Sequence, residues 1–130
     1  MRSIMQENST YSVEYNVKNK IFFKRYAGSI TLEDIFESWQ NAFKKNLIPE
    51  DVKGFVLDYR LAHLDFQLNE YHQIPEFYKD NIDYFLGRKI AVITSNPRDL
   101  VFPTLIKTMD DGYESKPFST EEAAILWINR

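Results

Sequence analysis

Two short, almost wholly apolar runs decide the fold: GFVLDY at residues 54–59 and IAVIT at residues 90–94. Runs of this length and composition are typical of strands buried on both faces, which are central strands of a parallel sheet covered by helices. Between them, large apolar residues recur at nearly helical intervals from Tyr71 to Phe85, with Pro75 inside the pattern. We therefore predict a strand–helix–strand unit with parallel strands at the centre of the molecule.

A hairpin and a helix precede this unit. Residues 11–17 (YSVEYNV) alternate between apolar and polar side chains, and residues 21–26 (IFFKRY) follow a short turn, which indicates an antiparallel hairpin. Residues 31–47 then carry an apolar stripe at helical spacing, opened by a capping box of Thr31 and Asp34. The first half of the chain is therefore predicted to run strand, strand, helix, strand.

The second half continues the alternation of helix and strand. Asn96 is placed to cap a helix, which Pro103 is expected to interrupt, and residues 113–118 suggest a short edge strand. Ser119 and Glu122 form a predicted capping box for a final helix. The predicted fold class is α/β: a mixed sheet of about five strands, with an N-terminal hairpin and a parallel centre, and about four helices. Residues 1–10 are expected to be disordered or extended, and residues 11–130 to form a single domain.

Composition excludes several classes of protein. The chain has 130 residues, of which 44% are hydrophobic and 15% aromatic, so it is not intrinsically disordered. A formal net charge of −3 creates no field that would recruit nucleic acid or an anionic membrane. The absence of cysteine excludes disulfides, thiolate catalysis and zinc ribbons. No stretch resembles a signal peptide or a membrane span, so we expect a cytoplasmic location without membrane insertion.

Polar side chains follow both apolar runs. Because ligands gather at the carboxyl ends of parallel strands, these side chains are the candidate binding residues. A histidine near two carboxylates could perform general acid–base catalysis, and arginines could hold an anion. The structural alternative is that Asp58 and Arg60 pair with each other and that Asn96 and Asp99 cap a helix. The candidates are Asp58, Arg60, His63, Asp65, Gln67, Ser95, Asn96 and Arg98.

Three functions remain open on this basis. The first is a non-enzymatic interaction domain, which we favour. The second is a small enzyme that uses the polar cluster around Asp58, His63 and Asp65. The third is a carrier of an apolar ligand, in which aromatic residues between positions 71 and 102 line a cavity. No cofactor or metal is expected, since His63 and His72 lack the spacing of a helical ligand pair.

Two strings and the order of elements resemble the STAS-like (SpoIIAA-like) domains. FVLDYR at residues 55–60 is similar to the central strand of that family, and FSTEEAAILWI at residues 118–128 is similar to the closing string of its small stand-alone bacterial members. The resemblance implies a domain that binds partner proteins through the loop after the central strand and the adjacent helix. It also implies a phosphorylated Ser or Thr in that loop, but residues 61–69 contain neither.

The sequence also suggests self-association, with no nucleic-acid partner. The alternating strand at residues 11–17 is expected to leave an unpaired edge, and the helical segment from Tyr71 to Phe85 has more aromatic residues than one buried face uses. We therefore predict a possible two-fold homodimer through one of these two surfaces.

Overall fold

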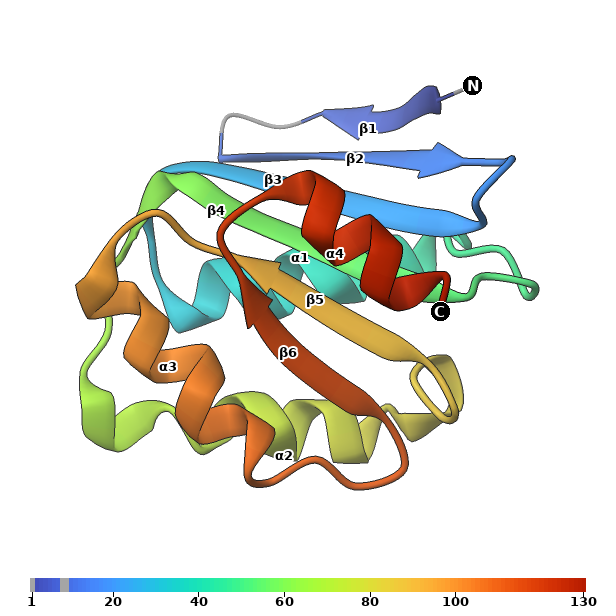
Figure 1. Cartoon of the computed structure of the whole chain (residues 1–130). Helices are drawn as coiled ribbons and strands as arrows, with labels where there is room; N and C mark the ends of the chain where they lie inside the picture. The colour runs from blue at the N-terminus through green and yellow to red at the C-terminus, as the bar shows by residue number, and fades with distance from the viewer. Residues whose placement is uncertain (1, 8–9) are drawn as a thin grey trace.

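One mixed sheet runs through the molecule, and helices cover both of its faces (Figure 1). The computed structural model describes residues 2–7 and 10–130. The strands in these residues are β1 (Arg2–Glu7), β2 (Tyr11–Asn16), β3 (Ile21–Ile30), β4 (Gly54–Leu64), β5 (Lys89–Ile93) and β6 (Glu114–Phe118). The α-helices are α1 (Leu32–Lys44), α2 (Gln73–Asp80), α3 (Pro97–Lys107) and α4 (Glu121–Ile128), with 3₁₀ turns η1 (Leu68–Glu70) and η2 (Ile82–Tyr84).

The parallel centre predicted from the two apolar runs is confirmed. Spatial order follows chain order from β1 to β6, with antiparallel pairing up to β3 and parallel pairing from β3 onward. Phe55 on β4 pairs with Ile90 on β5, and Leu57 pairs with Val92. Strands buried on both faces carry apolar residues at successive positions, which is why these two runs lack alternation.

The central strand is longer than predicted. β4 continues past residue 59 to Leu64, because β3 itself extends to Ile30 and supplies main-chain partners for the extra residues. The parallel register shifts between Arg25 and Ala27, where a bulge interrupts the pairing. Residues expected in a loop after the strand, among them His63, therefore lie on the strand itself.

The sheet also has a strand that the sequence did not indicate. β1 pairs antiparallel with β2, so the edge of β2 that we predicted to be unpaired is covered. That part of the self-association prediction is wrong as stated, because main-chain groups of residues 2–7 occupy the hydrogen-bonding positions. Of the N-terminal segment 1–10, residues 1, 8 and 9 lie outside the described residues.

Helix caps agree with the sequence at α1 and α3. The main-chain N–H of Asp34 donates to Thr31 Oγ1 at 3.1 Å, and the N–H of Thr31 donates to Asp34 Oδ2 at 2.9 Å, which completes the predicted capping box. Asn96 caps α3 as predicted, but α3 continues through Pro103 without interruption. Burial of Phe102, Pro103 and Ile106 against the sheet compensates the one main-chain hydrogen bond that proline removes.

The cap of α4 lies one residue later than predicted. Thr120, and not Ser119, accepts the main-chain N–H of Ala123 through its hydroxyl at 3.2 Å. Glu121 begins the helix and its carboxylate is held by Arg25 of β3 at 2.8 Å. This tertiary ion pair involves residues 96 positions apart, so local sequence gives no sign of it.

The sheet separates two apolar cores. Helices α1, α2 and α3 pack on one face, where Trp39 is fully buried among the rings of Phe55 and Phe85. Helix α4 alone packs on the other face, against a smaller core that includes Phe23 and Val56. The two faces follow from the pleat, because successive residues of each strand point to opposite sides.

Candidate functional site

Asp58 and Arg60 form an ion pair at the bulged end of the central strand. Arg60 donates from Nε to Asp58 Oδ1 at 2.9 Å and from Nη2 to Asp58 Oδ2 at 2.7 Å, a two-pronged geometry that suits guanidinium and carboxylate. The main-chain N–H of Arg60 also donates to Oδ1 at 3.0 Å. Burial by itself raises the pKa of Asp58, but the hydrogen bonds and charge of Arg60, with the charge of Arg25, bring that pKa below its ordinary value.

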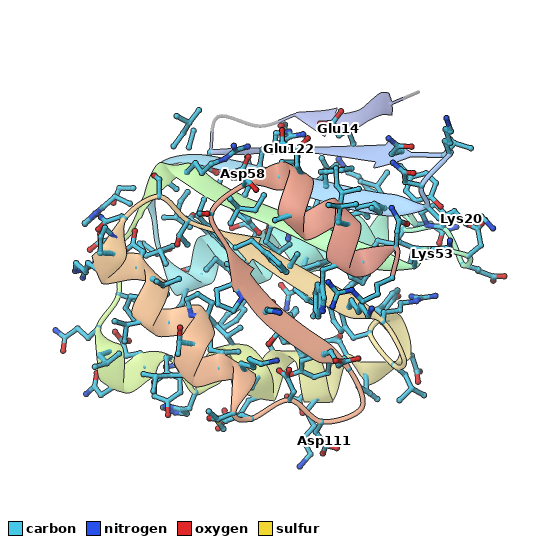
Figure 2. All side chains as sticks on the ribbon, viewed as in Figure 1. Glu14, Lys20, Lys53, Asp58, Asp111 and Glu122 are labelled. Carbon is cyan, nitrogen blue, oxygen red and sulfur yellow. The ribbon has the colours of Figure 1, made fainter. Side chains whose placement is uncertain are left out.

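Arg25 extends this pair into a network across three strands and a helix. It donates from Nη1 to Asp58 Oδ2 at 3.0 Å and to Glu121 Oε1 at 2.8 Å, and from Nε to Glu14 Oε1 at 2.9 Å. Figure 2 shows Glu14 of β2 and Asp58 of β4 beside the start of α4, where Glu122 is also labelled. Two guanidinium groups therefore form ion pairs with three carboxylates. The ion pair between Arg25 and Glu121 links the start of α4 to the sheet.

Sequence reasoning missed three members of this network. One signal was available: Arg25 shares the pleat face of the fully buried Ile21 and Phe23, and a charge on such a face needs a partner. Nothing local identified Glu14 or Glu121 as that partner, since their approach depends on strand pairing and on the docking of α4.

Hydrogen bonds hold the start of α3 in place, and they involve the side chains of Ser95, Asn96 and Arg98. Asn96 Oδ1 accepts the main-chain N–H of Arg98 at 3.0 Å, and the Arg98 guanidinium donates to Asp99 Oδ1 at 3.0 Å and to the carbonyl oxygen of Leu64 at 3.3 Å. The Ser95 hydroxyl donates to the carbonyl oxygen of Arg60 at 3.3 Å. These bonds tie α3 to the end of β4.

The remaining three candidates lie apart from the ion-pair network. His63 is exposed near the end of β4, and the Asp65 carboxylate accepts from the Ser29 hydroxyl at 3.4 Å. The main-chain N–H of Gln67 donates to Glu70 Oε1 at 2.9 Å at the start of η1. The structure thus divides the eight candidates into three groups, and it pairs the Asp58 carboxylate with arginines and not with His63.

No group of three metal-ligating side chains comes together in residues 10–130, the part of the chain whose side chains the structure describes. Within residues 2–7 and 10–130, no helix combines the length and the apolar character that a membrane crossing requires.

Four exposed leucine and valine side chains lie on the elements that carry the groups just described. Leu61 on β4 is 81% exposed, and Leu68 on η1 is 51% exposed. Leu100 and Val101 on α3 are each 42% exposed. We call these four residues together the strand-end face, because they lie at the carboxyl end of β4 and on the helical elements that follow β4 and β5. An open groove of about 460 Å³ is lined by Leu100 and by Ser95 and Phe118.

The aromatic residues of positions 71–102 are mostly part of the core. Tyr78, Phe85 and Phe102 are buried, and Tyr71, Phe77 and Tyr84 pack against them from partly buried positions. A cavity of about 30 Å³ remains between the sheet and helices α2 and α3. Small-molecule sites measure roughly 300–1,000 Å³, so this cavity is an order of magnitude smaller than a carrier would need.

Comparison with known proteins identifies the fold. No protein-family model matches the chain, and no curated protein matches its sequence. Among solved structures, the chain is similar to an uncharacterised protein of the DUF3478 family from Shewanella loihica PV-4, which has a SpoIIAA-like fold. The TM-score is 0.58 at 14% sequence identity, over 98% of this chain and 92% of that one. The chain therefore has the SpoIIAA-like (STAS-like) fold that its sequence resembles.

Proposed function

We propose that this protein is a non-enzymatic interaction domain that binds a partner protein through the strand-end face. The observation that carries the proposal is the exposure of Leu61. A leucine that is 81% exposed at the end of the central strand buries little apolar surface, so it contributes little to the stability of the isolated protein. Leu68, Leu100 and Val101 are three more exposed apolar side chains on the elements that follow β4 and β5, and clustered exposed apolar residues commonly mark protein interfaces.

Polar groups at the same surface support binding more than catalysis. The Asp58 carboxylate is engaged by Arg25 and Arg60, so it is a poor candidate for a general base. Exposed His63 and Arg98 adjoin the apolar residues, as polar groups do at the rim of an interface. Arg98 and Ser95 hydrogen-bond to main-chain carbonyls of β4, which holds α3 and the strand end in a fixed relation.

A charge substitution at the strand-end face tests this proposal. We expect Leu61→Asp to abolish binding of a partner that the wild-type protein retains from native lysate, with the partner then purified and titrated by calorimetry. Leu126→Asp is the matched control, because Leu126 is a 71% exposed leucine on α4 and is not part of the strand-end face. Melting curves of both variants test whether each remains folded. Equal binding by wild type, Leu61→Asp and Leu126→Asp, or no retained partner, would refute the proposal.

A further inference from the structure

A second surface lies between α1 and the start of α2 and shares no residue with the strand-end face. It is a shallow groove of about 400 Å³, within the size range of binding sites for small groups. We call it the acidic groove. Its lining residues are Leu32, Glu33, Phe36, Glu37 and Gln40 of α1 and Gln73 of α2.

The aromatic ring in this groove is held in place by stacking. Phe36 stacks on Phe77 of α2 with ring centroids 4.9 Å apart and planes 15° apart. The series continues from Phe77 to Phe43 at 6.2 Å and from Phe43 to Tyr84 at 3.9 Å, with planes 12° apart in each pair. Phe36 is therefore a fixed apolar surface, since moving it would disturb a stacked series that joins α1 to α2 and η2.

The two carboxylates of the groove have no cationic partner among the described residues. Glu33 and Glu37 are four residues apart on α1, a spacing at which like charges destabilise a helix. Neither Lys nor Arg stands three or four residues from either glutamate in the sequence. Asp34, the other acid of this turn, is already occupied by its capping bonds with Thr31. The groove thus combines two free negative charges with an aromatic ring.

This combination favours one class of occupant. A guanidinium group is planar and cationic, stacks on aromatic rings and pairs with carboxylates through several N–H groups. Glu33 and Glu37, with side chains about 5–6 Å apart at Cβ, can both contact such a group. A bare metal ion would gain nothing from Phe36 and Leu32. We propose that the acidic groove binds an arginine-bearing peptide segment of a partner protein, with the guanidinium beside Phe36 and between Glu33 and Glu37.

Amide-resolved NMR of the full 130-residue chain tests this inference, with hexaarginine as the probe and hexalysine and hexaglutamate as comparison peptides. We expect hexaarginine to shift amide signals in residues 32–40 and at Gln73, and to bind more tightly than hexalysine. Glu33→Gln/Glu37→Gln should weaken hexaarginine binding at least about fivefold, because two surface ion pairs are lost. Phe36→Leu keeps the charges, and it should reduce the preference for hexaarginine over hexalysine.

The matched control is Glu114→Gln/Glu122→Gln, which removes the same charge from exposed positions on β6 and α4. Its hexaarginine affinity should equal that of the wild type. Shifts spread evenly over the acidic surface, equal weakening by both double variants, or equal affinity for the two basic peptides would overturn the inference. If Phe36→Leu does not fold, the hexaarginine affinity of Glu33→Gln/Glu37→Gln decides whether the inference holds. The result is independent of the partner proposed for the strand-end face, because Leu61 lies outside the acidic groove.

Discussion

Replacement of Lys24 by methionine is predicted to make the protein more stable at pH 7 and to change how its stability depends on pH. Lys24 is fully buried (0% exposed) under α1. Its Nζ donates to Ser38 Oγ at 2.6 Å and lies 3.6 Å from the centre of the Trp39 ring. No carboxylate pairs with this amino group among the described residues, and burial lowers the pKa of Lys24 well below its ordinary value of 10.5.

The sign and size of the effect follow from proton linkage. Between the lowered pKa of the folded state and 10.5, the unfolded chain binds a proton at Lys24 that the folded protein does not. The free energy of unfolding therefore rises with pH, by up to about 1.4 kcal/mol for each pH unit in that interval. The methionine variant lacks this contribution. Ser38 stays satisfied in the variant, because its hydroxyl donates to the carbonyl oxygen of Ile35 at 2.7 Å and lies 2.9 Å from the Tyr26 hydroxyl.

Urea unfolding at pH 6, 7, 8 and 9 measures this effect, since urea adds no ionic strength. The stability advantage of Lys24→Met should shrink as the pH rises. The pH range stays below the ordinary pKa of tyrosine. Burial raises the pKa of Tyr26 in the folded protein, so above that pH the ionisation of Tyr26 in the unfolded chain would add its own pH dependence to the free energy of unfolding. Lys53→Met is the matched control, since exposed Lys53 loses the same charge (Figure 2). A constant difference between wild type and Lys24→Met at all four pH values would refute the reasoning.

Three further substitutions test the packing and the caps. Trp39→Ala should lower the free energy of unfolding by about 3–5 kcal/mol, because the ring is fully buried, and a loss under about 0.5 kcal/mol in urea titration would contradict the fold. Gly54→Ala should cost about 1–3 kcal/mol in the same assay, because a Cβ there would lie 2.8 Å from both the Ile128 side chain and the main-chain oxygen of Lys89; an unchanged midpoint would show that neither α4 nor β5 is packed this closely. Thr120→Ala should cost about 0.5–2 kcal/mol while Ser119→Ala has little effect, and the reverse order would restore Ser119 as the cap of α4.

Local sequence determined those helices and strands whose caps or hydrophobic patterns lie within a few consecutive residues. The capping box of Thr31 and Asp34 and the cap at Asn96 could be predicted because both partners of each hydrogen bond lie within three positions. The apolar runs at 54–59 and 90–94 predicted parallel central strands, because burial on both faces favours apolar residues at successive positions. For the candidate site, the sequence indicated polar residues after both apolar runs and suggested the pairing of Asp58 with Arg60, but it placed the end of the central strand too early.

Only the tertiary structure decided which charges meet and which surfaces stay open. Arg25 joins Glu14, Asp58 and Glu121 because strand pairing and the docking of α4 bring distant residues within hydrogen-bond distance. The exposure of Leu61 depends on the extension of β4 along β3, which the residues after position 59 do not encode by themselves. Hydrophobic periodicity shows which side chains need burial, but long-range packing determines which of them obtain it and which remain available to a partner.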